Sequence, residues 1–168
     1  MEAFPKPLRF LLPILSGCVL LAGCSSGNIT ISSGSSKPLD KRFFGEWRNE
    51  SLRVECATYR GSDSTYVLNV PAGKWEAIMK MKPIRTTYKP DGSYISEYRS
   101  LGDSVLIQRQ GGWFANGHEL TMRETKPDTR EYQFKYRFKG DLATFSSMLD
   151  FDSDGKNDDK YNGVQRKQ

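Results

Sequence analysis

The strongest constraint on the fold is a strict alternation of aromatic and polar residues in the C-terminal half. From Tyr132 to Lys139 the chain reads Tyr-Gln-Phe-Lys-Tyr-Arg-Phe-Lys. Successive side chains of a β-strand point to opposite faces, so Tyr132, Phe134, Tyr136 and Phe138 share one face. A strand of this kind has one face in a hydrophobic core and the other in water, which is typical of antiparallel sheets.

The same period of two recurs after residue 39, and no segment there keeps a helical apolar period over ten or more residues. Turn signals rich in Gly, Pro, Asn and Asp separate the alternating segments. We therefore predict an all-β fold without helices, a barrel or a sandwich of roughly eight to ten short antiparallel strands. Besides residues 132–139, the expected strands are marked by Tyr66/Leu68/Val70, Trp75/Ala77/Met79/Met81, Ile84/Thr86/Tyr88, Tyr94/Ser96/Tyr98, Val105/Ile107 and Leu120/Met122, with breaks at 89–93, 101–103, 110–112, 115–118, 126–128 and 139–141.

The N-terminus has the pattern of a secretory signal. Lys6 and Arg9 precede an apolar run, Phe10–Ala22, which ends in the small residues Ala22 and Gly23. Pro, Ser and Gly interrupt this run, and it falls short of the roughly 20 residues that a spanning helix needs. Residues 1–23 are therefore predicted to be a signal peptide.

The tetrapeptide Leu21-Ala-Gly-Cys24 resembles the bacterial lipobox. The resemblance implies cleavage before Cys24, a thioether-linked diacylglycerol and N-acylation by a chain such as palmitate, and hence a membrane anchor in the cell envelope. Ser25 after the cysteine favours the outer membrane, with the protein facing the periplasm. A second match ends at Cys18, but its apolar run is shorter. Residues 24–38 are rich in Gly and Ser and predict a flexible tether, so the folded domain spans residues 39–168.

Net charge gives little support for a nucleic-acid partner. The whole chain carries +5; without residues 1–23 it keeps 145 residues and 23 − 19 = +4. So modest a charge, on a protein of the cell envelope, predicts no nucleic-acid partner. We also expect a monomer. Basic residues on expected outer strand faces, Lys135 and Arg137 among them, favour binding to an anionic envelope polymer, a lipid headgroup or a partner protein.

Three short segments resemble motifs of bacterial lipocalin-like domains: Phe43-Phe-Gly45-Glu-Trp47, Tyr88-Lys-Pro-Asp-Gly-Ser-Tyr94, and residues 112–122, which begin with Gly-Trp and end with Leu-Thr-Met. The resemblance implies an up-and-down β-barrel that holds a small apolar or amphipathic ligand. It also implies that Trp47, after Gly45, closes the barrel floor with Arg166 packed over it. Trp47 and the other two tryptophans are also expected simply as core residues.

Nothing in the sequence favours catalysis. His118 is the only histidine and follows an Asn-Gly turn signal, where we expect it in solvent. Glu46, Glu97 and Glu124 are isolated carboxylates that we interpret as surface charges. Cys56 is the only cysteine after residue 24 and is expected as a small buried residue rather than a redox group. We therefore expect no enzyme.

One acidic segment, residues 150–159, has the spacing of a calcium loop. It reads Asp-Phe-Asp-Ser-Asp-Gly-Lys-Asn-Asp-Asp and resembles loops of extracellular calcium-binding modules. Tyr161 at position 12 argues against an EF-hand. Two interpretations stay open, a Ca²⁺ site or a solvated hairpin turn. The expected ligands are the carboxylates of Asp150, Asp152, Asp154 and Asp158 and the carbonyl of Lys156.

Two functions are compatible with these features. In the first, the barrel binds a small apolar or amphipathic ligand, which its aromatic and methionine-rich inner faces favour. In the second, side chains fill the barrel, and its outer face binds or inhibits an envelope protein. The two differ in whether the barrel interior is hollow or filled by side chains.

Overall fold

The computed structural model describes residues 38–168. The chain divides into two units, Met1–Gly34 and Ser35–Gln168, and every described residue belongs to the second. The predicted signal peptide, the lipidation site Cys24 and the tether up to residue 37 lie outside the described residues. Within residues 38–168, no helix is both long and apolar enough to cross a membrane.

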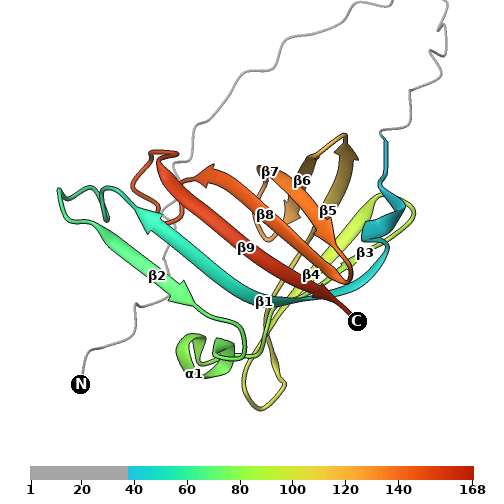
Figure 1. The fold of residues 1–168 in the computed structure, drawn as a ribbon, viewed down its shortest axis with the longest axis horizontal. Helices are drawn as coiled ribbons and strands as arrows, with labels where there is room; N and C mark the ends of the chain where they lie inside the picture. Colours follow the sequence, from blue (N-terminus) through green and yellow to red (C-terminus); the bar gives the residue numbers. More distant parts are fainter. Residues whose placement is uncertain (1–37) are drawn as a thin grey trace, which may run out of the picture. The chain divides into compact units, whose positions relative to one another are not determined.

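The described chain consists of strands, one short α-helix and one 3₁₀ helix (Figure 1). The 3₁₀ helix η1 spans Lys41–Phe43, and the α-helix α1 spans Trp75–Met79. The strands are β1 (Gly45–Cys56), β2 (Tyr66–Val70), β3 (Arg85–Tyr88), β4 (Ser93–Arg99), β5 (Val105–Asn116), β6 (Glu119–Lys126), β7 (Arg130–Lys139), β8 (Leu142–Leu149) and β9 (Asp159–Lys167).

All neighbouring strands run antiparallel, and from β3 to β9 each pairs with the next along the chain. The first strand closes the sheet: one edge of β1 pairs with β9 from Trp47 to Glu55, and the other pairs with β3 and then β2. Since β2 pairs with β1 only, eight of the nine strands form the closed barrel. The prediction of an all-β up-and-down barrel is confirmed, and the sandwich is not what forms.

The core consists of two hydrophobic clusters, to both of which Tyr161 of β9 contributes. All three tryptophans are buried, which confirms their expected role as core residues. The aromatic-rich cluster contains Phe43, Trp47, Tyr88, Tyr94, Trp113, Ala115, Leu120, Tyr136, Ala143 and Phe145. The smaller cluster contains Leu52, Val54, Cys56, Val70 and Trp75.

The prediction of a strand at Trp75–Met81, and of a fold without helices, is wrong. Residues 75–79 form α1, in which Trp75 is buried and Met79 packs against the smaller cluster. Residues four apart share one face of a helix, so Trp75 and Met79 satisfy a helical pattern as well as an alternating one. Lys80, in the left-handed conformation, then ends the helix.

The turn η1 is fixed against the aromatic cluster by Phe43 and Asp40. The Phe43 side chain is fully buried, and its ring centroid lies 4.8 Å from that of Tyr136. The Asp40 carboxylate accepts hydrogen bonds from the N–H of Arg42 at 3.0 Å and from the Tyr136 hydroxyl at 2.8 Å. The Arg42 side chain also hydrogen-bonds this carboxylate and, as the main cause, lowers the pKa of Asp40 to about 2.

Replacing Asp40 by Ala is expected to cost about 1 kcal/mol of unfolding free energy at pH 7, because a cap and a tertiary hydrogen bond are lost. The folded pKa of about 2 lies below the ordinary value of 3.8 for an Asp, so the contribution is complete above pH 4 and disappears as the pH falls to 2. Thermal unfolding at pH 7, 4 and 2 should show the two melting temperatures converging in acid. A difference independent of pH would contradict this assignment.

Candidate functional site

A charged pair lies on the inner face of the barrel. Arg109 of β5 lies four residues before the buried Trp113, and Glu124 of β6 lies four residues after the buried Leu120. Because alternate residues of a strand share a face, both charges point inward. Together with Tyr94, Tyr98 and Tyr132 they form what we call the interior polar cluster.

The contacts within the interior polar cluster are direct. Arg109 Nη1 donates to Glu124 Oε2 at 2.9 Å and to Oε1 at 3.3 Å. The same nitrogen lies 3.4 Å from the Tyr132 hydroxyl, and the Arg109 Cζ lies 5.4 Å from the centroid of the Tyr98 ring. The side chain of Glu124 is 1% exposed and that of Arg109 is 29% exposed, so solvent reaches only the Arg109 side chain of this pair.

One donor of the interior polar cluster has no partner. Arg109 Nε is buried and makes no hydrogen bond to any described residue. Burial opposes its charge, but Tyr98 and Glu124 raise the pKa of Arg109, so it stays a cation. Burial also raises the pKa of Tyr98, which Arg109 partly offsets. A buried N–H without a partner costs free energy unless a further acceptor binds it.

A β-bulge interrupts the β5–β6 pairing next to Arg109, with the extra residue on β6. The register of the β5–β6 pairing shifts between Gln110 and Gly111. A Cβ at Gly111 would lie 1.9 Å from the carbonyl oxygen of Arg123, so only glycine fits there. The prediction of a break at 110–112 is therefore wrong: these glycines allow a close approach inside one long strand.

Exposed apolar residues lie at the end of the barrel that the β4–β5 turn forms. Ile107 pairs with Tyr98 across β4 and β5 and is therefore on the same face of the sheet. Its side chain is 44% exposed. Three further apolar side chains at this turn are exposed, namely Leu101, Val105 and Leu106. Apolar side chains grouped at a surface in this way are typical of a binding site.

The residues of the predicted barrel floor are only partly brought together. Trp47 is 1% exposed and donates from its indole N–H to the carbonyl of Phe43. The cation over the Trp47 ring is Lys167, whose Nζ lies 5.7 Å from the ring centroid. Arg166 instead forms ion pairs with Glu50 and Asp141. Lys167 is the pairing partner of Trp47, and its neighbour Arg166 must point to the opposite face.

The histidine, the cysteine and the three glutamates considered in the sequence lie in different surroundings. His118 is exposed in the β5–β6 turn, and Cys56 is buried, as expected. Glu46 and Glu97 form ion pairs with neighbouring arginines on the barrel surface. The interpretation of Glu124 as a surface charge is wrong, since it is buried against Arg109.

The acidic segment forms the turn between β8 and β9. One carboxylate oxygen from each of Asp150, Asp152 and Asp154 lies within 4.8 Å of the others. Lys156 is exposed and Asp158 is partly buried. Asp159, which the calcium-loop pattern did not include, is fully buried beside Asp152 and Cys56.

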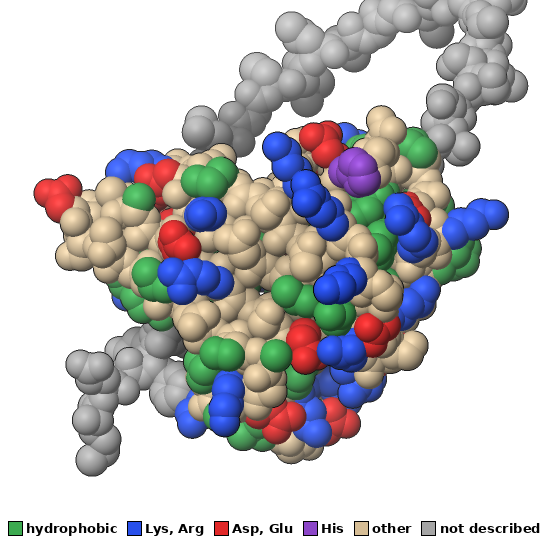
Figure 2. Space-filling model, in the orientation of Figure 1, with side chains coloured by type: hydrophobic (Ala, Val, Ile, Leu, Met, Phe, Trp, Pro, Cys, Tyr) green, Lys and Arg blue, Asp and Glu red, His purple; other side chains and the backbone are tan. Residues whose placement is uncertain are grey.

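A hollow of about 1030 Å³ lies against the six adjacent strands β2, β1, β9, β8, β7 and β6. Its lining includes exposed residues that alternate along their strands with buried core residues. Because successive side chains of a strand point to opposite faces, the hollow lies on the outer face of the barrel. Figure 2 looks onto this face, where basic side chains and the histidine surround a largely uncharged centre. The charged residues and the histidine of the lining are Arg42, Arg53, His118, Glu119, Lys135 and Arg137.

These features define a closed eight-stranded β-barrel with a charged pair inside it. No protein-family model matches the sequence, and no curated protein matches it. A lipocalin-like protein from Bacteroides uniformis ATCC 8492 is similar in structure, with 9% identity, a TM-score of 0.44, and coverage of 76% of this chain and 99% of that one. An uncharacterized protein from Bacteroides eggerthii DSM 20697 has 12% identity, a TM-score of 0.42, and coverage of 75% and 99%. Both similarities concern the fold alone.

Replacing Gly111 by Ala should destabilise the protein by at least about 3 kcal/mol, because the new methyl group collides with backbone atoms of β6. Gly102→Ala is the matched control. A Cβ at Gly102 meets only the Ser100 hydroxyl at 3.8 Å, and the change should stay within about 0.5 kcal/mol. Urea unfolding of both variants measures the difference; equal stabilities would show that the close approach at Gly111 is not needed.

Proposed function

We propose that this chain is a lipocalin-like lipoprotein of the bacterial envelope, anchored through Cys24, which binds a small amphipathic ligand with an acidic group and catalyses no reaction. The observation that carries the proposal is the buried Nε of Arg109, which has no acceptor among the described residues. A carboxylate or another oxyanion on the ligand supplies that acceptor. The Arg109 side chain is 29% exposed, so a ligand can approach it from solvent.

The surroundings of Arg109 fit the apolar part of such a ligand. Tyr98 and Tyr132 offer aromatic rings beside the guanidinium, and Ile107 extends the apolar surface toward the exposed turn. Small-ligand sites are mostly apolar with a few well-placed polar groups, which is the composition found here. An amphipathic anion thus matches both the charge and the rings.

The same groups are poor catalysts. Burial raises the pKa of Tyr98, so its hydroxyl keeps its proton at neutral pH and is a weak base. The Glu124 carboxylate is bound by Arg109. The buried hydroxyls of Thr86 and Ser96 hydrogen-bond each other at 2.8 Å. These contacts support a binding role.

The proposal is tested with dodecanoate and its uncharged analogue dodecanol, by calorimetry on the unit Ser35–Gln168. Arg109→Met/Glu124→Gln should weaken dodecanoate binding by roughly 10- to 100-fold, since a charge-assisted hydrogen bond is lost, and change dodecanol binding little. The double variant avoids leaving Glu124 buried and unpaired. Arg137→Met, on the outer face, is the control. Unchanged dodecanoate affinity in the double variant, or equal losses for both ligands, would refute the proposal.

A second candidate function is protein binding at the outer hollow. Lys135 and Arg137 of β7 are exposed and form no ion pair with any residue in 38–168, while Arg42 and Arg53 are paired with acids. Two exposed, unpaired cations beside a hollow favour an acidic partner surface. This function does not need a ligand inside the barrel.

Crosslinking in intact cells tests the second candidate. The variant Lys135→Glu/Arg137→Glu should lose a discrete crosslinked partner, because like charges would then face an acidic surface. The control Lys74→Glu/Lys126→Glu makes the same change of net charge at exposed positions outside the hollow. If both variants keep the partner, or both lose it, the outer hollow is not its binding site.

A further inference from the structure

The turn between β8 and β9 gathers five carboxylates within ten residues, Asp150, Asp152, Asp154, Asp158 and Asp159. Oxygens of the first three lie within 4.8 Å of one another. The side chain of Asp154 is 1% exposed, and the ammonium of Lys156 lies 3.8 Å from it. Like charges this close repel one another strongly where water is excluded.

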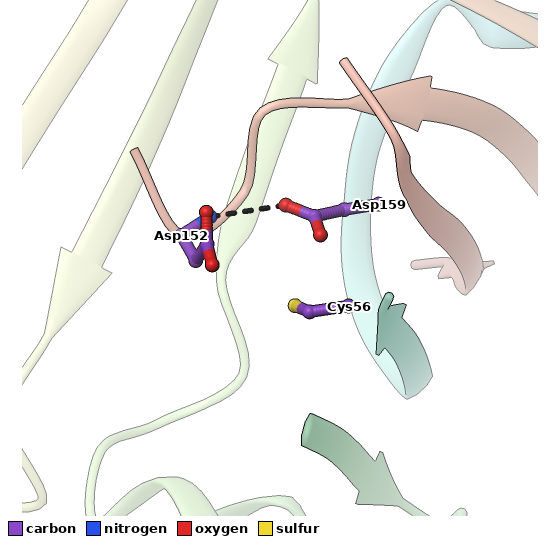
Figure 3. A group of neighbouring side chains, drawn as sticks. All are labelled: Cys56, Asp152 and Asp159. Carbon is purple, nitrogen blue, oxygen red and sulfur yellow. Dashed lines mark hydrogen bonds between the residues drawn. The ribbon is translucent and has the colours of Figure 1, made fainter. Parts of the chain in front are cut away.

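An independent observation is the carboxylate of Asp159, which is fully buried. Its Oδ2 accepts the N–H groups of Phe151 at 2.6 Å and Asp152 at 3.1 Å. Its Oδ1 is buried and has no N–H or O–H donor among the described residues; the thiol of Cys56 lies beside this carboxylate. Figure 3 shows this carboxylate beside Asp152, with the thiol of Cys56 next to both.

Asp158 also has a buried carboxylate oxygen without a hydrogen-bond partner. Its Oδ1 is buried and has no hydrogen-bond partner within residues 38–168, while its Oδ2 lies 3.5 Å from the Thr58 hydroxyl. Burying a charged oxygen without a partner costs several kcal/mol in proteins unless a proton or a cation neutralises it. Two such oxygens in one turn therefore indicate that the turn takes up positive charge.

The loop between β1 and β2 holds the acidic turn from the other side. The Thr58 hydroxyl donates to Asp154 Oδ2 at 3.1 Å, and the N–H of Arg60 donates to Asp152 Oδ2. These contacts join segments more than 90 residues apart in the chain. The carboxylates are thus held in place by a second element rather than by the turn alone.

We propose that this turn binds one Ca²⁺ ion through the carboxylates of Asp150, Asp152, Asp154 and Asp158 and the carbonyl of Lys156, with Asp159 supporting the turn from its buried side. The ligands are all hard oxygens in an irregular loop, which suits Ca²⁺ better than the smaller Mg²⁺. The inference does not depend on a ligand in the barrel.

A soft metal is a poorer match. The Cys56 thiol beside Asp152 and Asp159 is the only cysteine ligand near the turn among the described residues, and no histidine lies with it. Zinc therefore lacks its preferred set of sulfur and nitrogen ligands, whereas calcium needs none of them.

Thermal unfolding of the purified full-length chain in detergent tests the site. After treatment with EGTA, about 5 mM CaCl₂ should raise the melting temperature by at least about 5 °C, and excess EGTA should reverse the shift. The same concentration of MgCl₂, at matched ionic strength, should raise it by less than half as much. No shift with calcium, or an equal shift with magnesium, would overturn the proposal.

Variants separate this site from general effects of charge. Asp152→Asn and Asp150→Asn keep the size of the side chain and should each reduce the calcium shift to less than a third. Asp128→Asn, at an exposed position in the β6–β7 turn, is the matched control and should keep the full shift. If a variant fails to fold, calorimetric titration of the wild-type chain with CaCl₂ decides: saturable binding near one ion per chain supports the proposal, and its absence refutes it.

Discussion

The pairing of β1 with β9 is the interaction on which the rest of the structure depends. The ladder from Trp47–Lys167 to Glu55–Lys160 converts a meander of strands into a closed barrel without free edges along its length. Closure gives Arg109 and Glu124 an interior, where a charged pair is shielded from water. The β1–β2 and β8–β9 turns follow directly from these paired strands, so the same ladder brings Thr58 to Asp154.

The period of two predicted most strands because most have one buried face. In β7 the inward residue Tyr136 is buried and its neighbours Lys135 and Arg137 are exposed, as the sequence requires. The alternation predicted a strand wrongly at Trp75–Met79, because this short segment satisfies both an alternating and a helical pattern. The predicted break at Gly111 was also wrong. A turn and a close approach between strands both require glycine, and only the pairing of β5 with β6 distinguishes them.

The site was harder to predict than the fold. Arg109 and Glu124 are 15 residues apart and meet only because β5 and β6 pair with a bulge. The sequence did contain a signal for this pair. Arg109 is an even number of residues from Trp113, and Glu124 from Leu120, so each charge falls on the inward face of its strand. The acidic turn was visible from its spacing alone, but the buried Asp159 lies outside that pattern, and its burial follows from the barrel.

The two proposed sites share one physical property. Of the five buried side-chain polar atoms without a hydrogen-bond partner in residues 38–168, three belong to Arg109, Asp158 and Asp159. Folded proteins satisfy nearly all buried polar groups, and the exceptions call for an explanation, such as an ion that completes the site. The atoms that lack partners are one guanidinium donor of Arg109 in the barrel and two carboxylate oxygens in the turn. One site therefore calls for an acidic ligand and the other for a cation, so a single binding partner cannot serve both.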